Sequence, residues 1–366
     1  MSLQNRLTRL FGIRHPLVQA GMAGGATTPE LVAAVSEAGS LGTLGAGYLQ
    51  PWAIRDAIRE VRRLTDAPFA VNLFVPETFE EPESRESADE VLAPYRRELG
   101  IDEPGKFASY APDFEAQLAV VMQERVPVFS FTFGIPSDDQ LAALREAGVV
   151  TCGTATTVRE AGELERRGVD SVCAQGHEAG GHRGTFIGDA SEAMVGTLAL
   201  TPQVADAVDI PVLAAGGVMD GRGLAAVLAL GADGAQMGTA FLPCPESGAH
   251  PAYKRALLAA TDEDTTITRA FSGKPARGLR NRFTREMARH EPDVPDYPVQ
   301  NAYTRDLRAA AAERGDSELM SLWAGQGVRL IRETPAAELV GETVTEAERI
   351  LGGARHGQTP PSDPAV

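Results

Sequence analysis

The segment PVLAAGGVMDGRGLAAVLALGADGAQMGTAFL, residues 211–242, shows in one stretch the unit from which most of the chain is built. A short apolar strand is followed by a glycine-rich turn, an amphipathic helix and a second apolar strand. The helix carries apolar residues at three- and four-residue spacing, and a glycine closes it. The strands are apolar on both faces, which is typical of a parallel sheet covered on both sides. We therefore predict an α/β fold.

The same unit recurs and gives eight predicted strands. They lie near residues 16–21, 40–46, 69–75, 126–133, 149–154, 170–175, 211–216 and 234–241. Eight strands with helices between them predict a (β/α)8 TIM barrel. The alternative is an open, doubly wound sheet, which usually carries a dinucleotide-binding glycine fingerprint after its first strand. The segment QAGMAGG, residues 19–25, lacks that spacing, which favours the barrel.

Two segments interrupt the repeat and predict the domain organisation. Residues 76–112 are a charged insertion after the third strand, and residues 243–310 are irregular and rich in Arg, Pro and Tyr. Because insertions after strands lie on the face that carries barrel active sites, we expect the second segment to form a smaller cap or substrate domain. The barrel then spans 1–242. Helices that return to pack on the barrel occupy 311–352, and a disordered tail occupies 353–366.

Charge and cysteine content exclude several classes of function. The formal charge of −16 repels phosphate backbones and anionic lipids, so neither nucleic acid nor a membrane is an expected partner. Cys152, Cys173 and Cys244 lie on or beside apolar runs without metal-ligand spacing, which indicates reduced, buried thiols and no metal site. The N-terminal residues contain no signal-like apolar region. We expect a cytoplasmic protein.

The predicted strands end in small residues, and the last two ends are the most informative. Barrels commonly bind a phosphate with the loops after strands seven and eight, which here read AAGGV (214–218) and QMGT (236–239). Their backbone amides can hold an anion without a cationic side chain. The chain lacks a Walker lysine beside these loops, which disfavours nucleotide triphosphates. A phosphate-binding site next to strand ends lined by glycine, against which a flat ligand could lie, suggests flavin mononucleotide (FMN).

The loop AQGHEAGGHRGTF, residues 174–186, is the candidate catalytic segment. His177 and His182 are five residues apart and separated by two glycines, a spacing that does not suit a metal site. Glycines on both sides of the His182–Arg183 pair let the backbone approach a ligand, so His182 is a candidate proton acceptor. Glu178 is the rival base. We expect His177 to be structural, and Arg183 could either bind an anionic substrate or pair with an acidic neighbour.

Several of these motifs together resemble the class I nitronate monooxygenases, FMN-dependent enzymes formerly called 2-nitropropane dioxygenases. The motifs that carry the resemblance extend over nearly the whole chain: PLVQAGMAGGATTPELVAAVSEAGSLGTLGAG (16–47), VNLF (71–74), AQGHEAGGHRGTF, residues 211–242 and LWAGQG (322–327). EAGGHRG combined with AAGG and QMGT is the specific part of the pattern.

The resemblance implies roles for particular residues. His182 would be the catalytic base, and Tyr297 and Tyr303 would lie on the substrate side. Thr132, in FSFTFG (129–134), stands where some relatives carry a second histidine. The residues implied in FMN binding are Met22, Asn72, Gln175, Gly180, Gly217, Gln236, Met237, Gly238 and Thr239.

The activity implied is oxidation of alkyl nitronates, including propionate 3-nitronate, and of nitroalkanes. O2 is the co-substrate, a carbonyl compound and nitrite are the products, and neither pyridine nucleotide nor metal is needed. A neutral imidazole would take the α-proton of a nitroalkane, whereas a nitronate would not need that step. Two alternatives stay open. One is an FMN-dependent NAD(P)H reductase such as an enoyl-acyl-carrier-protein reductase, and the other is an inactive flavin-binding barrel.

Overall fold

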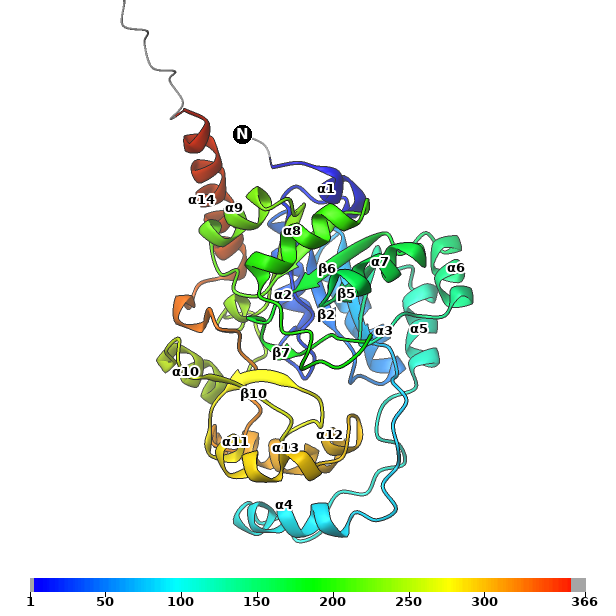
Figure 1. The fold of residues 1–366 in the computed structure, drawn as a ribbon, viewed down its shortest axis with the longest axis vertical. Helices are drawn as coiled ribbons and strands as arrows, with labels where there is room; N and C mark the ends of the chain where they lie inside the picture. The colour runs from blue at the N-terminus through cyan, green and yellow to red at the C-terminus, as the bar shows by residue number, and fades with distance from the viewer. Residues whose placement is uncertain (1–2, 357–366) are drawn as a thin grey trace, which may run out of the picture.

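The computed structural model describes residues 3–356, and its centre is a barrel of eight parallel strands (Figure 1). The pairing runs round the barrel in chain order, and β9 pairs with β1. The circle closes where Val18 bridges Leu41, just before β2. The predicted (β/α)8 TIM barrel is thus confirmed. The strands are β1 (Leu17–Gln19), β2 (Gly42–Gly45), β3 (Phe69–Phe74), β4 (Val128–Thr132), β5 (Val150–Ala155), β6 (Ser171–Gln175), β8 (Val212–Ala215) and β9 (Gly234–Met237).

Helices cover the outside of the barrel. Most begin at a residue whose side chain accepts a hydrogen bond from a first-turn N–H group, as Thr28, Asp113 and Asp220 do. Between barrel strands lie α2 (Pro29–Glu37), α3 (Pro51–Leu64), α5 (Phe114–Gln123), α6 (Asp138–Glu146), α7 (Val158–Arg166), α8 (Thr197–Ala207) and α9 (Gly221–Ala229).

The eighth helical position is filled late in the chain by α14 (Ala336–His356), which packs against α9 and α2. Its residues Leu339, Val340 and Val344 share a hydrophobic core with the barrel helices. Residues 353–356, which we expected to belong to a disordered tail, continue this helix. The rest of that predicted tail, 357–366, lies outside the described residues.

The two ends of the barrel differ in what fills them. At the N-terminal end, α1 (Arg6–Phe11) places Leu7 and Phe11 against the buried residues inside the barrel, among them Cys152 and Cys173. All three cysteines are buried and free. No helix of residues 3–356 is long and apolar enough to cross a membrane. The C-terminal end of the barrel faces the cap.

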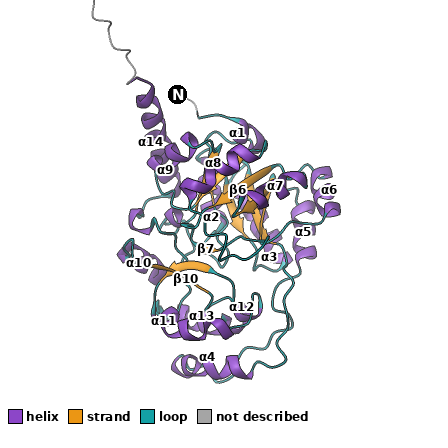
Figure 2. Ribbon diagram, viewed as in Figure 1, coloured by secondary structure: helices purple, strands orange, loops and turns teal. Residues whose placement is uncertain are grey.

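The cap contains a small sheet, and one of its strands is formed by two residues of a barrel loop. Strand β11 (Ala276–Leu279) pairs with β10 (Thr265–Thr268) and with β7 (Gly181–His182), which belongs to the loop after β6. Figure 2 shows β7 and β10 between the barrel and the cap helices. The remaining elements are η1 (Thr239–Phe241), α10 (Pro251–Ala259), α11 (Arg282–Met287), η2 (Ala288–Asp293), α12 (Val299–Tyr303), α13 (Arg305–Arg314) and η3 (Val328–Leu330).

The core of the cap extends beyond the segment expected from the sequence. Phe271 and Phe283 share this core with Val328, and the boundary expected at residue 310 falls within α13. The insertion 76–112 also joins the core, through Tyr95 of α4 (Glu86–Glu98). Figure 1 shows α4 on the side of the cap that faces away from the barrel.

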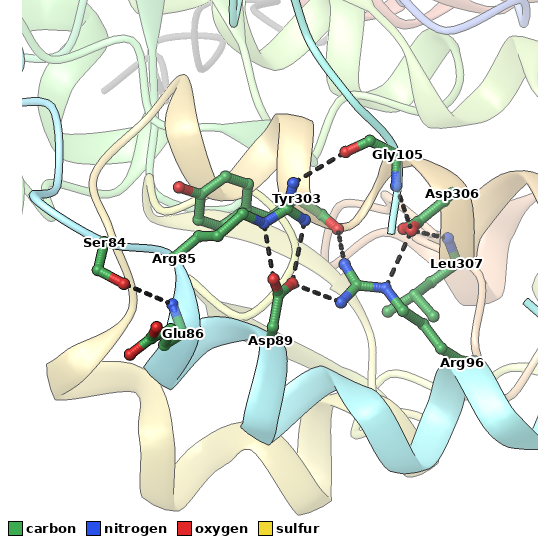
Figure 3. A network of polar contacts seen from close by, with 9 residues as sticks. All are labelled: Ser84, Arg85, Glu86, Asp89, Arg96, Gly105, Tyr303, Asp306 and Leu307. Carbon is green, nitrogen blue, oxygen red and sulfur yellow. Dashed lines mark hydrogen bonds and ion pairs between the residues drawn. The ribbon is translucent and has the colours of Figure 1, made fainter. Parts of the chain in front are cut away.

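A partly buried ion-pair network centred on the buried Arg96 fixes α4 to the cap (Figure 3). The Arg96 guanidinium donates to Asp89 (2.7 Å), to Asp306 (3.0 Å) and to the Tyr303 carbonyl (3.0 Å). Arg85 lies over the Tyr303 ring, 4.7 Å from its centroid. The contacts of Arg96 with Asp306 and Tyr303 join residues that are more than 200 positions apart in the chain.

Candidate active site

A cavity of about 520 Å³ lies between the C-terminal ends of the barrel strands and the cap. This is the end of a TIM barrel at which active sites occur. Both parts of the molecule line it, with small residues from the strand ends and with side chains from α10, α13 and residues 320–325. Nine of the predicted site residues line it: Met22, Asn72, Gln175, Gly180, His182, Gly217, Gln236, Gly238 and Thr239.

One wall of the cavity presents backbone amides that lack partners. The N–H groups of Gly216, Gly217, Gly238 and Thr239 have no hydrogen-bond acceptor within residues 3–356. Gly216 and Gly217 both have positive φ, 113° and 72°, which side-chain-bearing residues rarely adopt. Unpaired N–H groups are costly unless a ligand or water satisfies them. Four of them on neighbouring loops could together satisfy a bound anion.

Polar side chains at the strand ends are partly free to meet a ligand. The Asn72 amide donates to Ser130 Oγ (2.9 Å), which leaves its carbonyl oxygen without a partner in the described chain. The Gln236 amide has no protein partner there either and lines the cavity. Gln175 is different, because its amide oxygen accepts from Gly184 N (2.8 Å) and its nitrogen donates to the His182 carbonyl (3.0 Å). Gln175 therefore holds the candidate catalytic loop in place.

The charged residues beside His182 fix the conformation of the loop. Glu178 accepts from the backbone N–H and the hydroxyl of Thr197, at the start of α8 (2.8 and 2.9 Å). Arg183 is fully buried and donates to the carbonyls of Gly176 (2.7 Å) and Ala193 (3.0 Å). Burial lowers the pKa of Arg183 to about 10. Both side chains are engaged in structural contacts, which leaves His182 as the candidate base on this loop.

The His182 imidazole lies in an aromatic enclosure at the cavity. The rings of Phe133, Tyr297 and Trp323 surround it at centroid distances of 5.8, 5.9 and 5.3 Å. Its Nε2 lies 2.9 Å from Ser272 Oγ. Burial, with smaller contributions from the charges of Lys274 and Arg308, lowers the pKa of His182 to about 3. The ring is therefore neutral at physiological pH and has one unprotonated nitrogen, although the same burial makes its protonated form costly. By contrast, His177 is held by Arg277 (2.9 Å), as a structural histidine would be.

Two cations of the cap lie near His182, and one of them, Arg308, gives the cavity a positive character. Lys274 is neutralised by Glu77 (2.7 Å) and lies over the Phe133 ring. Arg308 lines the cavity and donates to Asn301 and Thr304, and no carboxylate pairs with it in the described chain. Burial lowers the pKa of Arg308. A half-buried guanidinium without a counter-ion favours an anionic ligand.

Three predicted site residues do not line the cavity. The Met237 side chain points into the core between barrel and helices, since alternate residues of β9 face opposite ways. Tyr303 packs on Phe107 and Arg85 of the insertion, so its expected place on the substrate side is not supported. Tyr297 lies beside His182 and hydrogen-bonds to Tyr48, which does line the cavity. Thr132 lines it as well, 3.3 Å from Thr154 Oγ1.

Sequence reasoning missed the aromatic and polar residues that surround His182. Phe133 follows β4 and has a φ of 78°, a conformation uncommon for an aromatic residue. No pattern in the sequence predicts this conformation. Trp323 lies within the motif 322–327, and Tyr48 directly follows the motif 16–47. These motifs were therefore the sequence signal that could have identified the two residues. Ser272 and Arg308 lie in the irregular cap, where no pattern distinguishes them. In residues 3–356, no group of three or more His, Cys, Asp or Glu is arranged to hold a metal.

Known proteins are similar to this chain over nearly its full length. The family model described as nitronate monooxygenase matches residues 4–346. A probable nitronate monooxygenase of Staphylococcus aureus is 47% identical over 95% of this chain and 98% of its own length. The crystal structure of a nitroalkane oxidase from Streptomyces ansochromogenes is 46% identical, covers 96% of this chain and 100% of its own, and superposes with a TM-score of 0.89.

A more distant solved structure shares the same architecture. FabK from Thermotoga maritima is 35% identical, with a TM-score of 0.77 over 96% of this chain and 99% of its own. The match of the family model and the close relatives, together with the barrel and its His182 site, gives the assignment: this chain belongs to the nitronate monooxygenase family and is a flavin-dependent oxidoreductase.

Proposed function

We propose that this enzyme binds FMN and oxidises alkyl nitronates with O2 to a carbonyl compound and nitrite. Nitroalkanes would enter the same reaction after His182 has removed their α-proton. The observation that carries the proposal is that a neutral histidine, an unpaired cation and a set of unpaired backbone amides that can bind an anion line the same cavity.

The residues present fit a flavin mononucleotide. The amides of Gly216, Gly217, Gly238 and Thr239 would hold its phosphate, as helix and loop amides do in other barrels. Asn72 and Gln236 offer unpaired amide atoms to the polar edge of an isoalloxazine ring. Met22 and Gly180 line the same cavity and leave room for a flat ligand. When bound, the flavin would supply the redox chemistry between substrate and O2.

The surroundings of His182 keep it in the unprotonated form that a proton acceptor needs, in a nearly dry site. The imidazole is neutral, and three aromatic rings limit the water around it. A substrate that is already a nitronate needs no base and gains from the positive character that Arg308 gives the cavity. We therefore expect anionic nitronates, such as propionate 3-nitronate, to be better substrates than neutral nitroalkanes.

A visible absorption spectrum of the purified protein tests the cofactor. We expect flavin bands, and heat release of the cofactor should give FMN rather than FAD. Colourless protein that does not bind added FMN would exclude the proposal. The thiols of Cys152, Cys173 and Cys244 are free and buried, which suits the reducing cytoplasm in which we place the enzyme.

Anaerobic mixing tests the reaction. Propionate 3-nitronate or ethyl nitronate should bleach the flavin, whereas NAD(P)H should not. Bleaching by NAD(P)H alone would instead assign the protein to the reductases, and bleaching by neither would indicate an inactive flavin-binding barrel.

A His182→Asn variant tests the proposed base. We expect it to lose at least about 100-fold in activity on nitroethane but much less on ethyl nitronate, because only the nitroalkane needs proton abstraction. Equal losses on both substrates would remove the base role and leave His182 as a binding residue.

A further inference from the structure

Ser272 is the polar group in contact with the His182 ring, and its hydroxyl is enclosed by protein. It lies in the turn between β10 and β11 and is 1% exposed. Its Oγ lies 2.9 Å from His182 Nε2, 3.1 Å from the Lys274 carbonyl and 3.3 Å from the Lys274 N–H. The other ring nitrogen, Nδ1, has no protein partner within residues 3–356.

The three contacts of this hydroxyl can be satisfied together in one way. A serine hydroxyl has one hydrogen to donate and two lone pairs that accept. If it donates to the Lys274 carbonyl, it accepts from the Lys274 N–H and from an Nε2–H of His182, and every group has a partner. If it donated to Nε2 instead, the Lys274 carbonyl would lose its donor. The Nδ1–H of the other tautomer would also lack a protein acceptor.

The turn that carries Ser272 is held in a fixed geometry relative to the histidine. Arg269 accepts from Gly273 N (2.8 Å) through its carbonyl and donates to the Gly273 carbonyl (3.0 Å) through its side chain. Gly273 is tightly enclosed, because a Cβ there would lie 2.2 Å from the Pro295 carbonyl oxygen. On the other side, β7 pairs His182 with Ala276 of β11. Backbone pairing thus sets the distance between Ser272 and His182.

We propose that Ser272 is a positioning residue that holds His182 in its Nε2–H tautomer and leaves Nδ1 as the atom that accepts the substrate proton. This inference rests on the proposed function. In the proton-transfer step the α C–H bond of a nitroalkane breaks and its electron pair moves into the nitro group, which gives the nitronate. The proton forms a bond to Nδ1, and the resulting imidazolium keeps its Nε2–H on Ser272 Oγ.

The tautomer can be measured without any substrate. In the 15N NMR spectrum of the wild-type holoenzyme at neutral pH, Nε2 of His182 should give a protonated, pyrrole-type signal, and Nδ1 an unprotonated, pyridine-type signal. The spectrum of His182→Asn identifies these signals among those of the six histidines. The opposite assignment in the wild type overturns the proposal, and this measurement does not depend on the folding of any serine variant.

Variants then show whether the hydroxyl is responsible. In Ser272→Ala we expect a mixture of tautomers and a fall of about 10-fold or more in kcat/KM for nitroethane, with less than a twofold change for ethyl nitronate. Ser171→Ala is the matched control, because it also removes a fully buried hydroxyl that donates to a carbonyl (3.0 Å), but at the start of β6. The control should change neither tautomer nor substrate ratio.

The outcomes separate this inference from the proposed function. If wild-type enzyme oxidises neither substrate, the proposed function fails, while the NMR assignment still stands or falls on its own. If the wild type is active and Ser272→Ala keeps the wild-type tautomer or the wild-type ratio of nitroethane to ethyl nitronate activity, the positioning role is refuted.

Discussion

At the scale of single residues, the two candidate bases in the loop after β6 have different surroundings. Glu178 and His182 both looked like bases in the sequence, but Glu178 is committed to the N-terminus of α8. An acidic group at that position stabilises the helix by capping it and by favourable interaction with the helix dipole. Arg183 satisfies main-chain carbonyls of the same loop. The catalytic assignment thus depends on which side chains are already engaged.

Glu178→Gln should lower stability without changing proton abstraction. We expect a loss of about 1 kcal/mol in the free energy of unfolding, because one charged helix cap becomes neutral. The ratio of nitroethane to ethyl nitronate activity of the flavin-saturated enzyme should stay at the wild-type value. The exposed Glu192→Gln is the control for stability. A selective loss of nitroethane activity would restore Glu178 as a base.

The depressed pKa of His182 has a consequence for acid stability. The folded protein keeps this ring neutral down to about pH 3, whereas the unfolded chain protonates it near the ordinary value of 6.5. Stability is therefore lost as pH falls below 6.5, because the unfolded state binds the extra proton. Relative to His182→Asn, the wild type should lose about 2 kcal/mol of unfolding free energy between pH 7 and 5, measured in urea. A pH-independent difference between the two proteins would contradict the low pKa.

At the scale of elements, β7 and the segment 322–327 bring the barrel loop and the cap into direct contact. Gly325 donates to Thr239 Oγ1 (2.9 Å) and Gln326 to the Glu178 carbonyl (2.9 Å). Close approach requires glycine at Gly180, where a Cβ would lie 2.6 Å from the Ala324 carbonyl carbon. The motif that contains His182 is thus in direct contact with the motif LWAGQG.

Gly180→Ala should separate these two segments. We expect a loss of stability of about 1–3 kcal/mol, because the added methyl group overlaps main-chain atoms that cannot rotate away. FMN affinity should fall as well. Gly162→Ala is the matched control, since a Cβ at that helical glycine meets no atom within 4 Å, and it should be neutral or slightly stabilising. Equal behaviour of the two variants in thermal unfolding and FMN titration would refute this contact argument.

We expect the ion pairs of Arg96 in α4 to hold the insertion against the cap. Arg96→Met would leave Asp306 without an ion-pair partner in a partly buried site, whereas Asp89 would keep its ion pair with Arg85. Breaking such a pair on one side costs about 3 kcal/mol. We expect faster cleavage within residues 76–112 in limited proteolysis, and the exposed neighbour Arg97→Met should be cut at the wild-type rate. Unchanged cleavage of Arg96→Met would show that apolar packing alone holds α4.

At the scale of the whole molecule, two parts of the chain line the cavity in which we propose that the cofactor binds. The amides that would hold the phosphate come from the barrel, whereas α10, α13 and residues 320–325 of the cap line the rest of the cavity. A ligand that contacts both parts binds only the assembled protein, so it stabilises the fold by mass action.

Removal of the flavin should therefore lower the melting temperature, and added FMN should restore it. At 100 times its Kd, the ligand contributes about 2.7 kcal/mol of stability. Riboflavin lacks the phosphate and should give a clearly smaller shift at the same concentration, because the amides of Gly216, Gly217, Gly238 and Thr239 remain unpaired. Equal shifts with FMN and riboflavin would refute the proposed phosphate site.

The sequence by itself determined the barrel, the positions of its eight strands and the loops that line the cavity. These features depend on local patterns: apolar runs of strand length, helical periodicity, and glycines where the chain turns. The same patterns pointed to Gly216–Gly217 and Gly238–Thr239 as an anion site and to His182 as the candidate base. The motifs around them carried the family resemblance.

Only the tertiary structure decided which partners these residues meet. In the folded protein, His182 pairs with the cap sheet and Glu178 is hydrogen-bonded to Thr197. The Met237 side chain lies in the core, and Tyr303 packs against the insertion. The fold also brings Ser272 and Arg308 to the cavity from a segment without periodicity. The physical reason is that local patterns fix which elements form, whereas contacts between residues 90 or 200 positions apart depend on how those elements pack.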